Sequence, residues 1–299
     1  MKEKKRKAAP IVKHKENHAP VPKGTLVVIG GAENKGETAP ENKKKPSDFV
    51  ALQVLEAFKS CIPKKEPRVE LVTTASGKGT ETYNDYVSAF EKVGITNLGH
   101  LHHNSREEVL ENQCLDRIRT ADAFFFSGGD QLKLTGYYGG TEFLKLLKQK
   151  YINEAFVIAG TSAGAMALST PMIYAGNDEV QELGGQIKVT TGLQFIRDVC
   201  VDTHFVHRGR FVRMAQVIIT NPTCIGLGLE EDTAIIVRNG VEAEVVGTGL
   251  VIVMEGFGLK DTNIDQFTED RPVTARDLTM HLLADGHKYL IPQMNPPHK

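Results

Sequence analysis

The stretch Phe156–Ala165, FVIAGTSAGA, constrains the fold more than any other part of the sequence. The apolar run Phe156–Ala159 predicts a buried strand, and Met166–Leu168 has the composition of a helix. Between them Gly160-Thr161-Ser162-Ala163-Gly164 fits G-x-S-x-G, which between a strand and a helix indicates a nucleophile elbow. Glycines in the turn let neighbouring chain pass close to it. The stretch predicts a catalytic serine at Ser162, and the alternative is a turn that binds a ligand or merely packs.

Short apolar strands alternate with helical segments before this turn. The predicted strands are Thr25–Ile29, Arg68–Thr74, Asn97–His102 and Ala123–Phe126, and the predicted helices are Phe49–Phe58, Tyr83–Val93, Arg106–Ile118 and Thr141–Tyr151. This alternation is typical of a mainly parallel sheet covered on both faces, which is a three-layer, flavodoxin-like α/β sandwich. After the turn, strand-like segments with short connections, AIIV, AEVVG and LVIVME, predict an antiparallel extension at the C-terminal end.

Small-residue turns follow several of the predicted strands. Because sites in open α/β sheets form at the carboxyl ends of strands, Gly30-Gly31, Gly128-Gly129 and the Ser162 turn should converge on one edge. None of these glycines is part of G-x-x-x-x-G-K or completes G-x-G-x-x-G, so the sequence argues against a nucleotide site.

Composition narrows the class of protein further. The formal net charge is −1 and no run of about 18 apolar residues is present, so neither nucleic acid nor a membrane is an expected partner. The polar, basic residues 1–23 predict a disordered tail, and residues 24–299 a single catalytic domain. Scattered cysteines, without C-x-x-C spacing, indicate buried free thiols in a reducing compartment: Cys61, Cys114, Cys200 and Cys224.

A serine nucleophile needs a base, and the base needs an orienting acid. His204 is the best-placed base, because it lies at a strand end downstream of the turn, whereas other histidines lie upstream or near the C-terminus: His102, His103, His281 and His287. His204 and His207 are three residues apart and raise the question of a metal site. No further His or Cys cluster completes such a site in the sequence, so neither a metal nor another cofactor is expected.

The acid is expected in the run Glu230-Glu231-Asp232, which follows a strand that should neighbour the strand of His204. The alternative for such a run is a solvated turn. An acid here gives the chain order Ser, His, Glu, whereas α/β-hydrolases have the order Ser, Asp/Glu, His.

These residues together give the chain a resemblance to the cyanophycinases and the wider peptidase E-like family of serine peptidases. The resemblance spans about residues 24–258 and rests on five separated motifs: VVIGGAE, FFSGGDQ, GTSAGA, DTHFVHRGRFVRM and GLGLEEDTA. It implies a fold like that of class I glutamine amidotransferases. The implied roles are nucleophile for Ser162, base for His204 and orienting acid for Glu231, with the amides of Gly129 and Ala163 as the oxyanion hole.

The resemblance also implies a substrate and a setting. Cyanophycinases are cytoplasmic homodimers without a cofactor, and they cleave cyanophycin, a poly-aspartate chain with arginine on each side chain, into β-aspartyl-arginine dipeptides. Substrate carboxylates would then meet Arg208, Arg210 and Arg213, and substrate guanidinium groups would meet Asp202, Asp130 and Glu33. This chain keeps the pocket glutamine Gln131 but departs from the family at Thr203, where the motif has glutamine, and at Thr135, where the family tends to have lysine.

Two other functions stay open at this point. A peptidase E-like dipeptidase that removes amino-terminal aspartate would place its acid between the serine and the histidine, where Asp178 and Glu179 stand. A non-catalytic peptide-binding protein on the same fold is the third possibility, and the complete set of serine, histidine and acid argues against it.

Overall fold

The computed structural model describes residues 20–36, 51–176, 187–264 and 273–292. Most of the predicted basic tail lies outside these ranges, and so do Asp178, Glu179 and the N-terminal part of the helix expected at Phe49–Phe58. Lys23, the last residue of the predicted tail, lies within the described ranges, and its amide donates to the carbonyl of Ile152 (3.1 Å).

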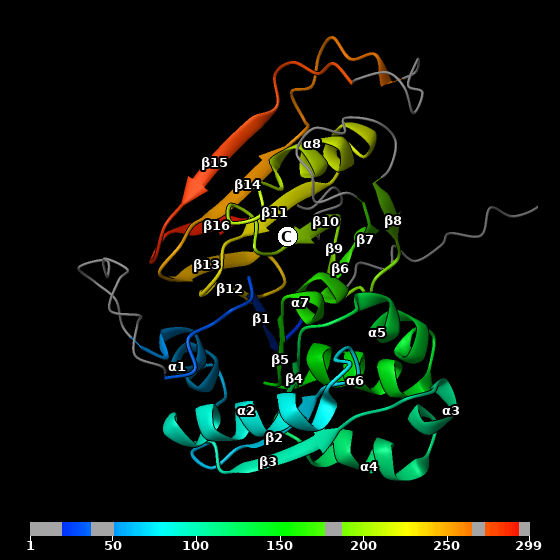
Figure 1. Ribbon diagram of the computed structural model, residues 1–299, viewed down its shortest axis with the longest axis vertical. Helices are drawn as coiled ribbons and strands as arrows, with labels where there is room; N and C mark the ends of the chain where they lie inside the picture. Colours follow the sequence, from blue (N-terminus) through cyan, green and yellow to red (C-terminus); the bar gives the residue numbers. More distant parts are fainter. Residues whose placement is uncertain (1–19, 37–50, 177–186, 265–272, 293–299) are drawn as a thin grey trace, which may run out of the picture.

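The larger sheet of the described chain has eight strands in the order β16-β13-β12-β1-β5-β4-β2-β3 (Figure 1). Its parallel half consists of β1 (Thr25–Ile29), β2 (Arg68–Val72), β3 (Asn97–Leu101), β4 (Ala123–Phe126) and β5 (Val157–Thr161). Its antiparallel half consists of β12 (Thr233–Arg238), β13 (Glu242–Gly247) and β16 (Lys288–Leu290). The mainly parallel sheet with a C-terminal antiparallel extension is therefore confirmed.

Both faces of this sheet are buried, as its apolar strands require. In β4, Phe125 packs on one face against Phe58 of α1 (Gln53–Ser60) and Phe90 of α2 (Gly79–Lys92), with ring centroids 5.4 and 5.3 Å away. The neighbouring Phe124 points to the other face, where it meets Phe143 of α6 (Glu142–Asn153) at 5.9 Å. Alternate residues of one strand thus supply two separate cores, and the sandwich has helices on both sides (Figure 1).

The sequence did not predict the second sheet. Its order within the described residues is β15-β14-β11-β10-β6-β9, and it comprises β6 (Ser169–Thr170), β9 (Ile196–Arg197), β10 (Val199–Asp202), β11 (Ile225–Leu229), β14 (Val251–Glu255) and β15 (Thr279–Leu283). A separate pair is formed by β7 (Met172–Ala175) and β8 (Lys188–Thr190). The chain changes sheet between β11 and β12, so residues 230–232 lie where the two sheets meet.

Several helices differ from the predicted ones. The segment expected as one helix at Arg106–Ile118 forms α3 (Arg106–Val109), which Ser105 caps through its side chain, and then α4 (Asn112–Thr120). The helix expected from Arg208 begins only at Phe211, as α8 (Phe211–Thr220). Arg208 and Arg210 therefore belong to the turn that joins β10 to this helix.

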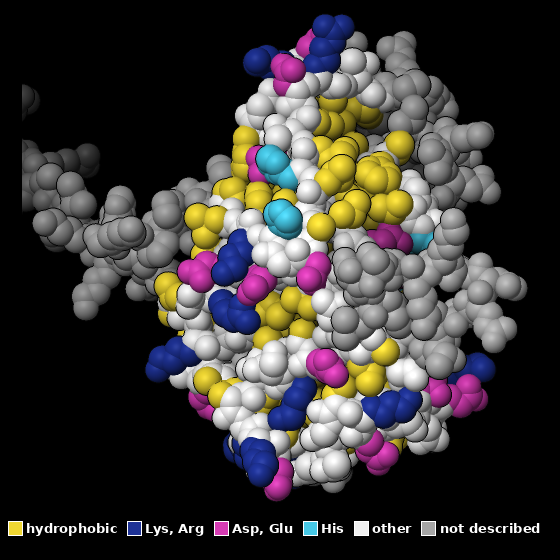
Figure 2. All heavy atoms as spheres, turned by 90° about the vertical axis from the view of Figure 1, so that its left-hand side faces the viewer, with side chains coloured by type: hydrophobic (Ala, Val, Ile, Leu, Met, Phe, Trp, Pro, Cys, Tyr) yellow, Lys and Arg dark blue, Asp and Glu magenta, His cyan; other side chains and the backbone are white. Residues whose placement is uncertain are grey.

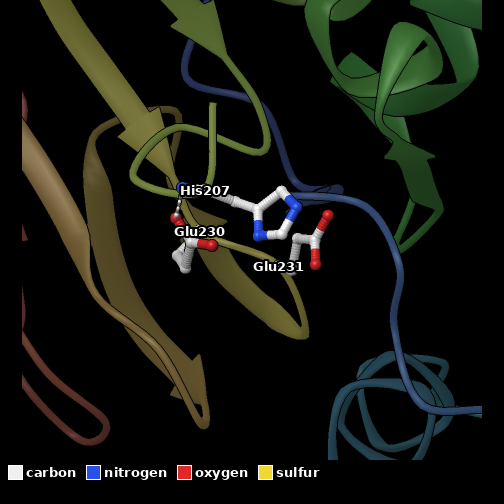
Figure 3. Close-up of side chains that lie close together, drawn as sticks. All are labelled: His207, Glu230 and Glu231. Carbon is white, nitrogen blue, oxygen red and sulfur yellow. Dashed lines mark hydrogen bonds between the residues drawn. The ribbon is translucent and has the colours of Figure 1, made fainter. Parts of the chain in front are cut away.

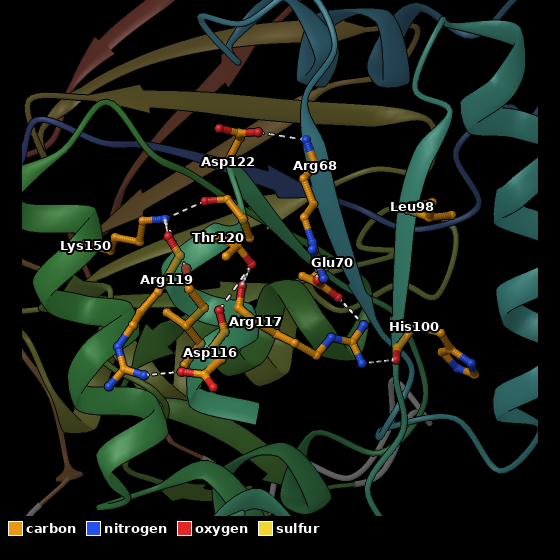
Figure 4. A network of polar contacts seen from close by, with 12 residues as sticks. Arg68, Glu70, Leu98, His100, Asp116, Arg117, Arg119, Thr120, Asp122 and Lys150 are labelled. Carbon is orange, nitrogen blue, oxygen red and sulfur yellow. Dashed lines mark hydrogen bonds and ion pairs between the residues drawn. The ribbon is translucent and has the colours of Figure 1, made fainter. Parts of the chain in front are cut away.

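A carboxylate is buried in the middle of β2. Glu70 is completely shielded from solvent, and its two oxygens pair with Arg68 (3.0 Å) on the same strand and with Arg117 of α4 (Figure 4). Arg117 also donates to the carbonyl of His100 on β3 (2.6 Å). A buried carboxylate is tolerated only when it is paired and hydrogen-bonded, so this network fixes α4 against the edge of the sheet.

Exposed apolar side chains lie on the two edge strands near the C-terminus. Met280 and Leu282 on β15 are 47% and 61% exposed, and Leu290 on β16 is 67% exposed. Figure 2 shows hydrophobic side chains gathered on this side of the molecule, with charged side chains around them. Apolar groups on the edge of a sheet are typical of a surface that contacts another protein.

Candidate active site

Ser162 lies in the turn between β5 and α7 (Ala163–Leu168), with φ 51° and ψ −118°. Such a conformation costs a residue other than glycine on the order of 1–3 kcal/mol and persists only where the surroundings enforce it. The two glycines of the motif, Gly160 and Gly164, allow the neighbouring backbone to pack closely around this turn. A Cβ on Gly160 would lie 2.6 Å from the backbone of Gly164, and a Cβ on Gly164 would lie 2.2 Å from the carbonyl oxygen of Phe126. The structure therefore has the strand, strained turn and helix predicted from the sequence.

His204 lies in the turn after β10, and its ring faces the serine. The Nε2 atom is 3.0 Å from Oγ of Ser162, and Nδ1 is 2.6 Å from Oε1 of Glu231. The side chain of His204 is 11% exposed and that of Glu231 31% exposed. Three segments far apart in the sequence thus meet in one hydrogen-bonded line of hydroxyl, imidazole and carboxylate, the geometry of a serine triad.

The glycine turns that follow β1 and β4 lie beside this line, as predicted from the strand ends. A Cβ on Gly31 would lie 2.5 Å from the imidazole of His204, and a Cβ on Gly128 would lie 3.3 Å from Cβ of Ser162. Gly129 has φ 137°, and a Cβ there would lie 2.1 Å from the carbonyl oxygen of Ala75. Side chains at Gly31 and Gly129 would displace the histidine or the loop, whereas one at Gly128 would only press on Ser162.

The amides of Gly129 and Ala163 are those expected to form an oxyanion hole. Gly129 and Ala163 both line the cavity beside the serine. Within the described ranges, the amide of neither residue donates a hydrogen bond to another backbone or side-chain group. Unused donors next to a nucleophile suit the stabilisation of a developing negative charge.

The run of three acids has three different roles in the structure. Glu231 meets His204, whereas Oε2 of Glu230 accepts from the amides of Val206 (2.6 Å) and His207 (3.1 Å). Asp232 accepts from the amide of Asn34 (2.8 Å), and burial raises the pKa of its carboxyl group. The structure thus brings Glu231 of this run to His204 and engages its two neighbours with backbone amides, and the role of Glu231 as the orienting acid stays a prediction.

His207 does acquire metal-ligating neighbours, contrary to the reason given for excluding a metal. One ligand atom each of His207, Glu230 and Glu231 lie within 4.8 Å of one another, and the imidazole lies between the two carboxylates (Figure 3). An imidazole with two carboxylates is a donor set suited to a divalent transition-metal ion. The two glutamates follow His207 by 23 and 24 residues in the sequence, so the cluster forms only when the chain folds.

A cavity of about 210 Å³ opens beside Ser162. Its lining among the described residues carries three guanidinium groups and no carboxylate, and it comprises Gly129, Gln131, Ser162, Ala163, Met166, Ile173, Tyr174, Ala175, Gly176, Thr203, Arg208, Arg210 and Arg213. The amide of Gln131 donates to the carbonyl of Ile173 (2.9 Å), and Thr203 contributes a buried hydroxyl without a hydrogen-bond partner among the described residues. The positive charge of the three guanidinium groups favours the binding of an anionic group in this cavity.

Asp202 cannot meet a substrate guanidinium as the sequence suggested. It is completely buried, and its carboxylate pairs with Arg210 (2.9 Å) and with Nε of Arg213 (2.6 Å). Arg210 also donates to the carbonyl of Thr203 (2.9 Å). Arg210 and Arg213 line the cavity and are at the same time held by the protein's own acid, so a carboxylate clamp at Arg210 stays a prediction. Arg208 is exposed, and no ion pair to it is formed by the described residues.

The other two acids expected to meet guanidinium groups also have partners within the protein. Glu33 is 5% exposed and accepts from the hydroxyls of Tyr86 and Thr161, so it is not available to a substrate. Asp130 is exposed, and its Oδ1 caps α5 (Gln131–Tyr138) by accepting from the amide of Leu132 (2.8 Å).

The remaining histidines and the cysteines serve elsewhere. His102 bonds to Thr73, and His103 bonds to Tyr138 (2.7 Å) beside a separate cavity of about 450 Å³. His281 pairs with Glu255 on the second sheet (3.5 Å).

The thiols are free, as predicted. Those of Cys114, Cys200 and Cys224 are buried and that of Cys61 is partly buried. No helix in the described ranges has the length and apolar composition to cross a bilayer.

Comparison with known proteins identifies the relatives of this arrangement. A cyanophycinase from Geminocystis herdmanii is 27% identical over 267 residues, which cover 89% of this chain and 93% of the relative. A crystal structure of a peptidase from an acI-B1 Actinobacterium superposes with a TM-score of 0.63 at 21% identity, covering 91% of this chain and 98% of that one. A candidate peptidase E protein from Listeria monocytogenes superposes with a TM-score of 0.51 at 18% identity, covering 76% and 99%. The two structural likenesses show a shared fold.

The sequence profile of peptidase family S51 matches residues 43–245, which is more than half of the chain. That range contains the serine, the histidine and the acid that meet in the structure. The chain therefore belongs to peptidase family S51 and is a serine-type peptidase.

Proposed function

We propose that the protein hydrolyses aspartyl peptide bonds through an acyl-enzyme on Ser162, with cyanophycin as the leading substrate. The observation that carries the proposal is the line from Ser162 Oγ to His204 Nε2 (3.0 Å) and from His204 Nδ1 to Glu231 Oε1 (2.6 Å), beside a cavity lined by guanidinium groups. The similarity to curated cyanophycinases supports the choice of substrate class.

The chemistry follows from the positions of the groups. His204 takes the proton of Ser162 as Oγ attacks the carbonyl carbon, and Glu231 stabilises the imidazolium that forms. The amides of Gly129 and Ala163 donate to the oxyanion of the tetrahedral intermediate. His204 then passes the proton to the leaving amine, and a water molecule activated by the same imidazole hydrolyses the acyl-enzyme.

The cavity supports an acidic residue next to the bond that is cleaved. Arg208 is exposed at the cavity and is placed to form two parallel hydrogen bonds with a substrate carboxylate. The buried hydroxyl of Thr203 supplies one further polar contact, since buried polar groups are almost always hydrogen-bonded. In cyanophycin the free carboxylate of each repeat belongs to the arginine branch, because the aspartyl side chains are amidated, whereas in aspartyl dipeptides the aspartyl side chain provides the anion.

A peptidase E-like dipeptidase is the second candidate. Two of the acids expected to bind the arginine branches of cyanophycin, Asp202 and Glu33, are buried and engaged within the protein. The described lining of the cavity therefore offers an anion site more clearly than a guanidinium site. A cytoplasmic location and a homodimer stay predictions of the resemblance.

The test incubates the purified protein with cyanophycin and, separately, with a panel of aspartyl dipeptides, and identifies products by mass spectrometry. Ser162→Ala is the matched control, and it should lose roughly a million-fold in rate and all labelling by a fluorophosphonate, with an unchanged melting temperature. Release of β-aspartyl-arginine from the polymer supports the cyanophycinase, and cleavage of dipeptides alone supports the second candidate. Hydrolysis by Ser162→Ala at the wild-type rate would refute the mechanism.

A further inference from the structure

Residues 29–34, the last residue of β1 and the turn after it, are called the β1 turn here. This segment is hydrogen-bonded to the segments that carry the nucleophile and the base. The amide of Ser162 donates to the carbonyl of Ile29 (3.1 Å). The amide of His204 donates to the carbonyl of Gly30 (2.9 Å). Neighbouring carbonyls of one turn therefore set the backbone positions of both residues.

The same turn is bonded to the segment of the acid. The amide of Asp232, next to Glu231, donates to the carbonyl of Gly31 (2.9 Å). In return, the amide of Asn34 donates to Oδ1 of Asp232 (2.8 Å). Three consecutive carbonyls of the turn thus receive one amide from each triad segment, although these segments come from two different sheets.

The three donor residues share an unusual backbone conformation. Ser162, His204 and Asp232 have φ values of 51°, 49° and 49°, in the left-handed region that residues other than glycine rarely adopt. Such residues keep this conformation only where neighbouring structure over-determines it. The β1 turn is the neighbour that all three share, so its own position controls the alignment of the triad.

Glu33 anchors this turn. The side chain is 5% exposed, and its carboxylate accepts from the hydroxyl of Tyr86 on α2 and from Oγ1 of Thr161 (2.6 Å), the residue before the nucleophile. Within the described ranges no lysine or arginine pairs with Glu33, so these two hydroxyl donors are what hold the carboxylate. The bond to Thr161 ties the turn directly to the elbow strand, and the bond to Tyr86 ties it to α2.

We propose that Glu33 is a positioning residue for the peptidase reaction, which holds the β1 turn so that the turn aligns Ser162, His204 and Glu231. The expected change in kcat rests on the proposed function, whereas the expected change in the position of the β1 turn does not. Glu33 does not itself line the cavity beside Ser162. Its effect is therefore on the rate of the chemical step and not on substrate binding.

The variants are chosen to separate positioning from general stability. Glu33→Gln keeps the size of the side chain and weakens both contacts, Thr161→Val removes one hydroxyl donor at constant shape, and Thr161→Ser restores that hydroxyl. Glu70→Gln is the matched control, because Glu70 is also a fully buried carboxylate but lies in the network with Arg68 and Arg117.

Kinetics are expressed per active site, counted by titration with a fluorophosphonate, so that misfolded protein does not contribute. We expect Glu33→Gln and Thr161→Val to lower kcat per site by about 10- to 100-fold, with KM within about threefold, since a displacement of about 1 Å can cost roughly a hundredfold. Thr161→Ser should retain near wild-type kcat, and Glu70→Gln should lower stability without changing kcat per site. Unchanged kcat per site in Glu33→Gln, or an equal loss in Glu70→Gln, would overturn the proposal.

Amide hydrogen exchange gives a second readout that needs no substrate. In Glu33→Gln the amides of Ser162, His204 and Asp232 should exchange at least about tenfold faster than in the wild type, while those of β2 should not change. Unchanged exchange at all three amides would overturn the role of Glu33. A wild-type protein that neither reacts with the fluorophosphonate nor cleaves aspartyl substrates would contradict the proposed function instead, and the exchange rates would still decide the structural role.

Discussion

Replacing Glu231 by glutamine removes the charge beside His204 while it keeps the size of the side chain. The carboxylate is 2.6 Å from Nδ1 of the imidazole, and in the proposed mechanism it stabilises the imidazolium that forms when Ser162 gives up its proton. Glutamine can still accept the same hydrogen bond through its carbonyl oxygen. The substitution therefore tests the electrostatic contribution more than the orientation of the ring.

The exposure of Glu231 sets the expected magnitude. Two unit charges about 4 Å apart attract by roughly 4 kcal/mol at an effective dielectric constant of about 20, and by about 1 kcal/mol in bulk water. Because the side chain of Glu231 is 31% exposed, its contribution lies between these limits. At about 1.36 kcal/mol per tenfold, the range corresponds to roughly 5- to 900-fold in rate. We expect a loss of about a hundredfold, smaller than the roughly ten-thousandfold loss known for a fully buried triad acid.

The measurement is kcat/KM on the substrate identified by mass spectrometry, together with the rate of fluorophosphonate labelling of Ser162. Glu230→Gln is the matched control on the adjacent residue. Its carboxylate accepts from the amides of Val206 and His207, and glutamine retains one acceptor oxygen, so the loss should stay below about tenfold. A Glu231→Gln enzyme within threefold of the wild type, or one no slower than Glu230→Gln, would refute the assignment of Glu231 as the orienting acid.

Three further predictions concern two cavity arginines and a buried imidazole. Arg208→Ala should lower kcat/KM for aspartyl substrates by about tenfold at an unchanged melting temperature, since a hydrogen bond to a charged group contributes roughly 1.5 kcal/mol. Arg210→Lys should instead lower the melting temperature, by about 2–4 °C per kcal/mol, because Arg210 lies in the buried ion pair with Asp202. A lower melting temperature with unchanged kcat/KM in Arg208→Ala, or an unchanged melting temperature in Arg210→Lys, would contradict these roles. Burial lowers the pKa of His103 from its usual 6.5, so its contribution to stability is complete above pH 6.5 and is lost as the pH falls below that value. Denaturant unfolding at pH 7.5 and 5.5 should show a smaller loss of stability on acidification in His103→Gln than in the wild type, and equal losses would contradict the prediction.

Local patterns in the sequence were enough to predict the parallel half of the fold. Apolar strands such as Ala123–Phe126 and Val157–Thr161 are buried on both faces, so they read as continuous hydrophobic runs. The elbow could be recognised by its two glycines, although only Gly160 is required within the turn, where it packs on Gly164, and Gly164 is required because the carbonyl of Phe126 on β4 lies against it. Ser162 follows from this stretch alone, the position of His204 at a strand end indicated the base, and the family resemblance singled out Glu231 within the acidic run.

Long-range pairing decided what the patterns could not. The segments after the elbow are strand-like, but a strand-like pattern does not reveal its neighbours. The separation of β11 and β12 into two sheets, which brings Glu231 to His204, became visible only in the structure.

The same reason explains why charged residues expected to bind a substrate have partners within the protein. The sequence shows that Asp202, Glu33 and Arg210 are charged, but a charge is available to a substrate only if the protein does not already neutralise or bond it. Asp202 pairs with Arg210 across one turn, and Glu33 meets hydroxyl groups from another helix and strand. The sequence by itself determined which residue types the chemistry uses. Only the tertiary structure decided which of them face the cavity and which hold the site in place, because burial and pairing depend on contacts between segments that are distant along the chain.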